Sequence, residues 1–313
     1  MIAQPTTPAP PTPADTFRLL LARGQELELV PGRPLLMGVV NVTPDSFSDG
    51  GQFLAPELAI EHALRLVDEG ADLIDLGAES TRPPGGTYGA GASAVEAADE
   101  LARLLPVVAG LRRQSGVPVS IDTRKAAVAG ALLDAGADLL NDVSGLEDPQ
   151  TAALAAATGC PVVLMHHHGI FSATSPRRAA GRLVEEVRAG LATCLERALA
   201  AGCRRDQLVL DPGLGFGKHG AQNLELLRRL ADLATLGRPL LVGASRKSFL
   251  GAASSLPSPA APADRLPESL AAAAWATAGG AAILRVHDVA ATRRFLAAWQ
   301  AIAAQPRDPE AAS

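Results

Sequence analysis

The chain has 313 residues, of which 48% are hydrophobic and 19% charged, so it can build a large buried core and is not globally disordered. The formal net charge is −5 without a block of Lys or Arg, which argues against a nucleic-acid-binding protein. Three cysteines without a CxxC spacing exclude a disulfide framework and a zinc knuckle.

The first sixteen residues are rich in Pro and Thr and have neither a basic segment nor an apolar segment of the secretory type. We expect 1–16 and 305–313 to be tails, the first of them disordered. No apolar run reaches the ~18 residues of a membrane helix without interruption, so we expect no membrane association. These features together predict a cytoplasmic protein with reduced cysteines.

Between the tails, short apolar runs alternate with longer amphipathic stretches. The runs are 35–41, 71–78, 118–122, 138–142, 161–166, 208–213, 239–245 and 281–287. The amphipathic stretches include 56–69, 95–113, 124–135, 182–201, 222–235 and 266–278. Buried strands alternating with helices predict a parallel sheet, and eight such units match an α/β fold of the (β/α)8 TIM-barrel type. We therefore expect a single barrel domain over 17–304; an open doubly wound sheet is the alternative, but no GxGxxG follows the first strand.

Polar residues end nearly every expected strand. They are Asn41, Glu79 to Arg82, Asp122, Asn141, Met165 with His166, Asp211, Ser245 to Ser248, and Arg285 with His287. Lysine and asparagine each occur only three times in the chain, yet Asn41, Asn141 and Lys247 all fall in this set. Because TIM-barrel active sites lie at the C-terminal ends of the strands, the pattern predicts one active site there.

The rim divides into two sectors. The eighth, first and second strands supply a cationic sector suited to a diphosphate, formed by Arg285, His287, Asn41, Thr81 and Arg82. Asn41 can also be an oxygen ligand of Mg²⁺. The third to seventh strands supply groups that suit a flat heterocycle with adjacent N–H donors, namely Asp122, Asn141, Met165, Asp211 and Lys247.

These segments resemble the dihydropteroate synthase family, in the order in which that family has them. The matching segments are MGVVNVTPDSFSDGG (37–51), GAESTRPP (77–84), SIDTRK (120–125), NDVSGL (141–146), LMHHHG (164–169), LDPGLGFGK (210–218), GASRKSFLG (243–251) and RVHD (285–288). The resemblance implies condensation of 6-hydroxymethyl-7,8-dihydropterin diphosphate with p-aminobenzoate to 7,8-dihydropteroate and diphosphate. It also implies Mg²⁺ and a homodimer.

The resemblance implies a role for each matching position. The metal ligand is Asn41, and the catalytic groups are Lys247, Arg285, His287 and Arg82. The pterin diphosphate contacts are Thr81, Asp122, Asn141, Met165, Asp211, Gly243, Lys247, Arg285, Val286 and His287. The p-aminobenzoate contacts are Ser248, Phe216 and Pro44, and the loops 42–52 and 82–92 match flexible loops that close over substrate.

The residues also favour a type of chemistry. No Ser or Cys nucleophile paired with a base is evident. We therefore expect a dissociative substitution, in which the diphosphate leaves first and the neutral arylamine then attacks the pterin methylene.

Several alternatives stay open at this point. His166 and His168 could bind zinc, although we favour loop or supporting histidines. Lys247 could be a Schiff-base lysine, but its SRKS setting has no obvious apolar pocket. Asp75 and Glu79 could be acid/base groups or could order the loops around them.

The chain also departs from the family pattern. Ala78 stands where a glycine is usual, and His167 and His168 differ from the usual residues. Other readings of the whole chain are a pterin-binding methyl transferase that acts on a corrinoid, and a catalytically silent paralogue. The SRKS and RVHD segments disfavour the first, and the joint presence of Asn41, Lys247 and His287 disfavours the second.

Overall fold

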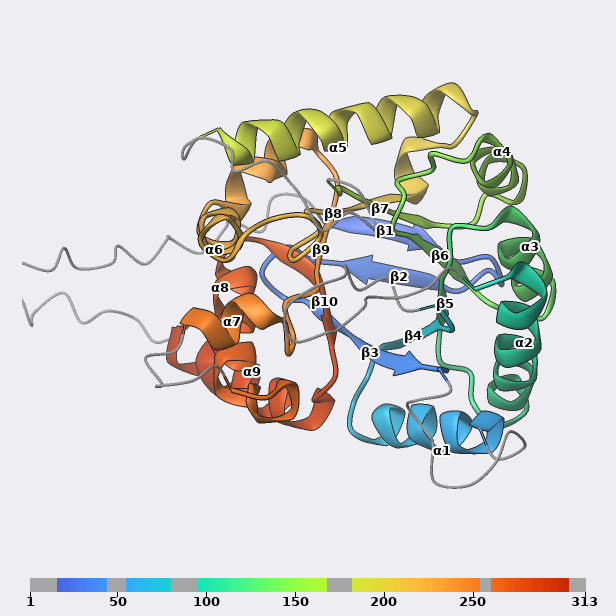
Figure 1. Cartoon of the computed structure of the whole chain (residues 1–313), viewed down its shortest axis with the longest axis horizontal. Helices are drawn as coiled ribbons and strands as arrows, with labels where there is room; N and C mark the ends of the chain where they lie inside the picture. Colours follow the sequence, from blue (N-terminus) through green and yellow to red (C-terminus); the bar gives the residue numbers. More distant parts are fainter. Residues whose placement is uncertain (1–15, 44–54, 80–94, 168–181, 254–259, 304–313) are drawn as a thin grey trace, which may run out of the picture.

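The computed structural model describes residues 16–43, 55–79, 95–167, 182–253 and 260–303 (Figure 1). Nearly all of the predicted tails 1–16 and 305–313 lie outside these ranges, so the division of the chain into tails and a barrel domain stays a prediction. None of the described helices has both the length and the apolar character needed to cross a membrane.

In the described part of the chain, eight parallel strands close into a barrel (Figure 1). They are β3 (Leu35–Asn41), β4 (Leu73–Gly77), β5 (Val119–Asp122), β6 (Leu139–Asp142), β7 (Val162–Met165), β8 (Leu208–Asp211), β9 (Leu240–Val242) and β10 (Ala281–Val286). Strands adjacent in the chain are paired, and β10 pairs with β3 to close the ring. The predicted TIM barrel is confirmed, and every predicted apolar run contains one observed strand.

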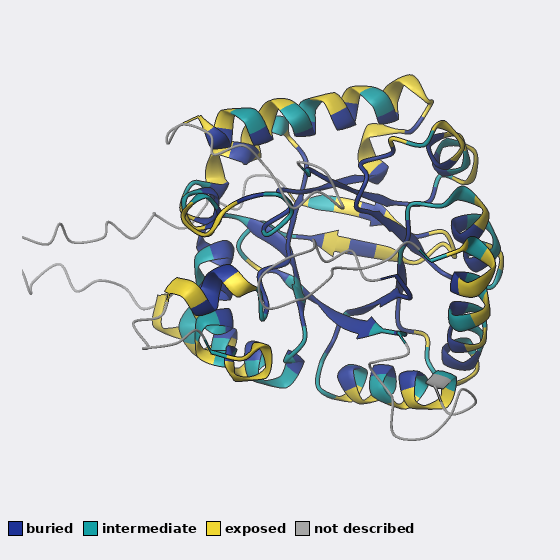
Figure 2. Cartoon of the chain, viewed as in Figure 1, coloured by how far each residue is buried: buried dark blue, intermediate teal, exposed yellow. Residues whose placement is uncertain are grey.

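Helices surround the barrel. They are α1 (Ala55–Asp68), α2 (Ala97–Gln114), α3 (Ala126–Asp134), α4 (Pro149–Thr158), α5 (Leu183–Ala200), α6 (Gly220–Arg228), α7 (Ser248–Ala253), α8 (Leu266–Ala278) and α9 (Val289–Ala303). Short 3-10 segments are η3 (Arg205–Gln207), η4 (Leu230–Leu236) and η5 (Pro262–Asp264). Figure 2 shows buried strands inside helices whose outer faces are exposed, and the main core fills the layer between them.

One predicted helix, over 222–235, is divided in two. α6 ends at Arg228, and η4 begins at Leu230 after Arg229 has left the helical conformation. The guanidinium of Arg229 binds Glu185 of α5 at 2.7 Å and Asp232 at 2.6 Å. These contacts, one to α5 and one to η4, accompany the break, which periodicity alone does not reveal.

A hairpin that the sequence analysis did not predict precedes the barrel. β1 (Phe17–Leu20) and β2 (Glu26–Leu29) pair antiparallel, and Leu19, Leu27 and Leu29 are buried. These leucines share one apolar cluster with residues inside the barrel, including Met37, Leu73, Leu139, Val163, Val209, Leu241 and Ile283. The hairpin therefore closes the N-terminal end of the barrel and leaves the C-terminal end for a site.

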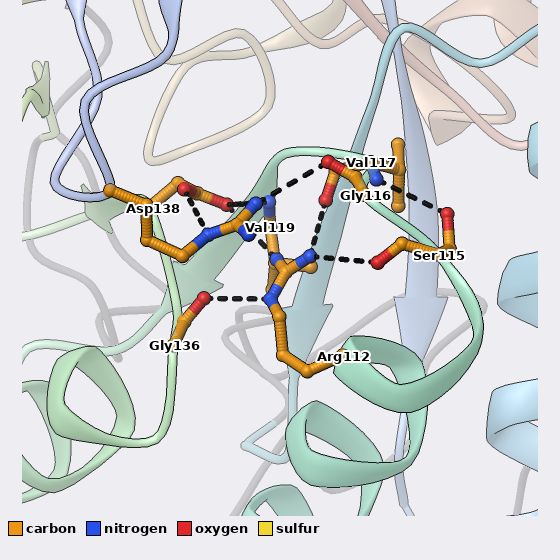
Figure 3. Close-up of polar contacts among 8 residues, drawn as sticks. Arg112, Ser115, Gly116, Val117, Val119, Gly136 and Asp138 are labelled. Carbon is orange, nitrogen blue, oxygen red and sulfur yellow. Dashed lines mark hydrogen bonds and ion pairs between the residues drawn. The ribbon is translucent and has the colours of Figure 1, made fainter.

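A buried carboxylate fixes this closed end (Figure 3). Asp138 is fully buried, and its oxygens accept from Arg23 Nε at 2.8 Å, Arg112 Nη2 at 2.9 Å and the Val119 amide at 2.8 Å. Arg112 also donates to the Gly136 carbonyl at 2.7 Å. Since the hairpin residue Arg23 shares this carboxylate with Arg112 of α2, the network joins the hairpin to the barrel.

Candidate active site

At the open end, Arg285 joins three strands. Its Nε lies 2.6 Å from Asp75 Oδ2, and its Nη2 lies 3.1 Å from Asp122 Oδ2. Asn141 Nδ2 donates to the same oxygen of Asp75 at 3.2 Å. Arg285, which we assigned to the diphosphate sector, therefore also contacts Asp122 of the ring sector. Asp75 is fully buried beneath this group, which favours a supporting role over that of an exposed acid or base.

The loop after β8 brings a second group together. Asp211 is buried, and its Oδ1 accepts the Gly213 amide at 2.7 Å. Lys247 Nζ donates to the Leu214 carbonyl and lies 4.7 Å from the centre of the Phe216 ring. Met165 packs with Val143 and Phe216 in a small apolar cluster. An apolar wall therefore does lie beside Lys247, contrary to the expectation from its SRKS setting.

Lys218 supports this loop from within and was not among the predicted site residues. It is buried, and its Nζ donates to the carbonyls of Gly213 at 2.7 Å and His166 at 3.2 Å. Its rarity in the sequence was the only signal that could have marked it.

Burial shifts the ionisation of these groups. Burial raises the pKa of Asp122 to about 7, although Arg285 opposes the shift, and burial also raises the pKa of Asp211. Burial lowers the pKa of Lys247 to about 8 and that of Lys218 to about 7, with Asp211 opposing both shifts. For Arg285, burial acts in the opposite direction, but Asp75 and Asp122 raise its pKa. Arg285 therefore remains a cation, whereas the pKa values of Asp122, Lys247 and Lys218 lie near neutral pH.

The diphosphate sector opens into a cavity of about 440 Å³. Its lining consists of Val39, Asn41, Leu58, Glu61, His62, Arg65 and His287. Asn41 ends β3, while the His287 amide donates to Ser245 Oγ at 3.2 Å and His287 Nδ1 lies 3.1 Å from the same oxygen. Asn41 and His287 therefore share one cavity, as the sector assignment required.

The sequence did not predict that residues of α1 would line this cavity. Glu61, His62 and Arg65 lie on a helix whose sequence pattern indicated only its core-facing side. Arg65 Nη2 lies 2.6 Å from His62 Nδ1, and burial followed by Arg65 lowers the pKa of His62. Nothing in their spacing marked these residues as part of the site.

Three further predicted residues occupy distinct positions. Gly243 passes close to Arg285, since a Cβ added there would lie 3.6 Å from Arg285 Cβ. Ser248 is the exposed first residue of α7. The Val286 side chain belongs to the core between barrel and helices, so only its backbone can serve the site. Thr81, Arg82 and Pro44, with most of the loops 42–52 and 82–92, lie outside the described residues.

The zinc alternative stays untested because His168 lies outside the described residues, whereas Glu79 has the contacts of a residue that orders the segments around it. Over the described residues, which exclude His168, no cluster of three His, Cys, Asp or Glu side chains could hold a metal. The His166 ring packs against Gly190 of α5, and His167 Nε2 lies 3.4 Å from Glu147 Oε1. Glu79 binds Lys125 at 3.2 Å and accepts the Val95 amide at 2.9 Å, so it ties together segments beside the mouth.

Comparison with known proteins identifies the family. Residues 37–287 match the family described as pterin binding enzyme. The dihydropteroate synthase of Synechocystis sp. is 42% identical over 279 residues, which cover 89% of this chain and 93% of the relative. The Escherichia coli dihydropteroate synthase is 40% identical and covers 87% of this chain and 92% of its own length.

Solved structures agree with these relatives. A Xanthomonas albilineans dihydropteroate synthase with 4-aminobenzoic acid superposes with a TM-score of 0.83 at 43% identity, covering 93% of this chain and 100% of that one. The same organism's enzyme in complex with 7,8-dihydropteroate gives a TM-score of 0.79 at 42% identity, covering 92% and 100%. The chain belongs to the pterin-binding enzyme family and, within it, to the dihydropteroate synthases.

Proposed function

We infer that this chain condenses 6-hydroxymethyl-7,8-dihydropterin diphosphate with p-aminobenzoate to form 7,8-dihydropteroate and diphosphate. The observation that carries this inference is the arrangement at one barrel mouth. There, Asp122, Asp211 and Lys247 surround Arg285, and Asn41 and His287 line the adjoining cavity. One ligand with a polar ring and an anionic tail would engage both parts of the mouth.

The ring binds on the carboxylate side. Asp122 and Asp211 accept N–H groups of the pterin, Asn141 offers an amide, and Lys247 donates to a ring acceptor. Met165 and Phe216 supply an apolar wall that fits a flat ring. Asp211 is buried and Asp122 is only partly exposed, so hydrogen bonds from the ring would form where little water competes.

The diphosphate binds on the side of Asn41 and His287, where Arg285 and Arg82 neutralise its charge and Thr81 donates a hydrogen bond. We assign Asn41 as a protein ligand of Mg²⁺. The residues fit this ion, because the Asn41 amide and the Glu61 carboxylate offer oxygen donors around one cavity. When bound, the ion would stabilise the charge that develops on the leaving diphosphate.

The second substrate binds last and nearest to solvent. Ser248 at the start of α7, together with Phe216 and Pro44, holds p-aminobenzoate. The exposed position of Ser248 fits a group that meets the carboxylate end of this substrate at the entrance of the mouth.

The reaction follows a dissociative course. The bond between the exocyclic methylene carbon and the diphosphate oxygen breaks, and its electron pair leaves with the diphosphate. Arg285 and His287 stabilise that developing charge. The amine nitrogen then forms the new C–N bond with the methylene cation and releases one proton to solvent. Because the attacking amine is neutral, no strong general base is needed.

Two further properties are proposed for the whole protein. We propose a homodimer, which solution scattering of the full chain would test. We also propose a cytoplasmic location, which fits the free, buried thiols of Cys160, Cys194 and Cys203.

The test of the activity measures diphosphate release and 7,8-dihydropteroate formation with and without p-aminobenzoate. We expect product only when both substrates and Mg²⁺ are present, and release of diphosphate without p-aminobenzoate would support the dissociative order. Methyl transfer to a corrinoid, or no turnover at all, would instead support the methyl transferase or the silent paralogue.

One substitution tests the ring subsite. Asp211→Asn should weaken pterin diphosphate binding by about 1–3 kcal/mol, because a charged hydrogen bond is lost. The matched control is Asp206→Asn, since Asp206 is an exposed partner of Arg204 away from the mouth. Equal affinities of the two variants would refute the assignment of Asp211.

A further inference from the structure

A left-handed residue lies at the corner between β9 and α7. Arg246 has a φ of +59°, a conformation that residues other than glycine rarely adopt. Its two neighbours in the chain are Ser245 and Lys247, which belong to different sides of the mouth. A backbone in this conformation persists only where the surroundings hold it.

The start of α8 holds both polar backbone groups of Arg246. The Arg246 amide donates to Ser269 Oγ at 3.0 Å, and the Arg246 carbonyl accepts from Arg265 Nη1 at 2.8 Å. Ser269 Oγ in turn donates to the Arg265 carbonyl at 2.6 Å. Ser269 and Arg265, which lie one helical turn apart, therefore both hydrogen-bond to the backbone of this corner.

Arg265 is buried where its guanidinium donates to backbone carbonyls. It is only 1% exposed, and its Nε donates to the Ala260 carbonyl at 2.8 Å. A Cβ on Gly251 of α7 would come within 2.7 Å of Arg265 Nε, so a glycine is needed where the guanidinium passes. Burying a guanidinium against carbonyls is costly, which argues that the contact serves more than packing.

The residues of this corner contact groups on both sides of the mouth. Ser245 Oγ contacts the amide and Nδ1 of His287, and the Arg246 side chain pairs with Asp288, where its Nε lies 3.0 Å from Oδ2. On the other side, Lys247 donates to the Leu214 carbonyl beside Phe216.

We propose that Arg265 and Ser269 are positioning residues, which hold Arg246 in its left-handed conformation and thereby aim Lys247 and His287 into the mouth. They touch no substrate themselves. The catalytic consequence rests on the proposed function, whereas the structural consequence for Lys247 does not.

The first test uses the scarcity of lysine. The chain has only Lys125, Lys218 and Lys247, so the side-chain carbons of three lysines can be followed through a pH titration by NMR after ¹³C-lysine labelling. In Ser269→Ala we expect the Lys247 titration to move from about 8 toward its ordinary higher value, because the ammonium is released from its buried position. The titrations of Lys125 and Lys218 should stay in place.

The matched control is Thr277→Val, which removes another buried hydroxyl from the same helix. Thr277 Oγ1 donates to the Ala273 carbonyl at 2.8 Å and does not contact the corner. This variant should leave all three lysine titrations and kcat/KM unchanged. Ser269→Ala should lower kcat/KM roughly tenfold, the effect of about one lost hydrogen bond.

The second test addresses the backbone conformation itself. Asp288→Asn weakens the Arg246 ion pair, and adding Arg246→Gly to that background makes the left-handed conformation easy for the backbone. Ser269→Ala should therefore reduce kcat/KM less in the Asp288→Asn/Arg246→Gly background than in Asp288→Asn alone. An equal reduction in both backgrounds would contradict the proposed backbone role.

The outcomes separate this proposal from the proposed function. A lowered melting temperature in Ser269→Ala, with an unmoved Lys247 titration, would overturn the positioning role. A moved titration in a chain that forms no dihydropteroate would refute the activity and leave the positioning of Lys247 standing. Arg265→Met tests the same point, and Ser269→Ala decides it if that variant does not fold.

Discussion

The two ends of the barrel both bury charged groups, but they use them differently. At the N-terminal end, Asp138 receives two guanidinium groups and a backbone amide, and the leucines of the β1–β2 hairpin seal it from water. At the C-terminal end, burial shifts the pKa values of Asp122, Asp211 and Lys247 toward neutrality. A buried carboxylate that is paired with two guanidinium groups behind a hydrophobic seal stabilises the fold, whereas the groups at the open end carry shifted pKa values at a place that a ligand can reach.

The largest difference between the two ends is expected when the same substitution, Asp to Asn, is made at each. Asp138→Asn should lower the free energy of unfolding by about 4 kcal/mol, because Arg23 and Arg112 lose their shared charge. Asp122→Asn should not lower it, because Arg285 keeps Asp75 and a carboxylate that is costly to bury is removed. Urea unfolding at pH 8 measures both, and comparable losses would remove the distinction between the ends.

Lys247 provides the next largest effect. Lys247→Met keeps an apolar stem near Phe216 but removes the hydrogen-bond donor. We therefore expect kcat/KM to fall roughly a hundredfold, which corresponds to a loss of about 3 kcal/mol of transition-state stabilisation. The free energy of unfolding at pH 7 should not fall, because the native state no longer holds a desolvated ammonium. Steady-state kinetics and urea unfolding of the same preparation would check both statements. A stability loss as large as that of Asp138→Asn would assign Lys247 to the fold.

The pH dependence of stability should differ in sign between two groups at the open end. Asp122 has a folded pKa of about 7, above its ordinary value, so the native state keeps a proton that the unfolded chain releases. Its contribution therefore makes stability fall as pH rises from about 4 to about 7. Lys247 has a folded pKa of about 8, below its ordinary value, so its contribution makes stability rise between about 8 and about 10.4.

Unfolding curves measured across pH would separate these contributions. Asp122→Asn should abolish the first slope and Lys247→Met the second, each without changing the other. A persistent slope in the matching variant would show that another group carries it.

The smallest effect is expected on the outer edge of the hairpin. Arg18 and Glu26 form an exposed ion pair at 3.2 Å, and Arg18→Ala should change the free energy of unfolding by less than about 1 kcal/mol. Leu29→Ala, on the buried face of the same hairpin, should cost about 2–5 kcal/mol. Thermal unfolding of the pair tests whether the hairpin stabilises the barrel through its leucines, and a small effect of Leu29→Ala would argue against it.

The barrel could be predicted because the strands are short, largely apolar runs and longer amphipathic stretches alternate with them. The hairpin could not, since β1 and β2 are only four residues long each and acquire their leucine contacts from the whole barrel. The site could be located from the polar residues at the strand ends, because active sites of TIM barrels lie at the C-terminal ends of the strands. Their pairing was not predictable: Arg285 contacts Asp75 and Asp122 across strands, and no single-strand pattern encodes such a contact.

Other parts of the site depend on residues whose local pattern gives no functional signal. Arg265 directly precedes a helix, a position that gives no sign of burial, yet it is among the most deeply buried large side chains. Glu61 and Arg65 read as an ordinary exposed helix face. Such residues acquire their roles from elements that pack against them, and those contacts are long-range.

The hairpin that closes the barrel also constrains the order of events during biosynthesis. Its leucines pack against side chains from β3 through to Ile283 in β10, and Arg23 pairs with a residue 115 positions further along the chain. The hairpin therefore cannot complete its contacts until β10 has been translated. Such distant contacts slow folding, and in the interval the nascent chain exposes a strip of leucines that a chaperone could cover.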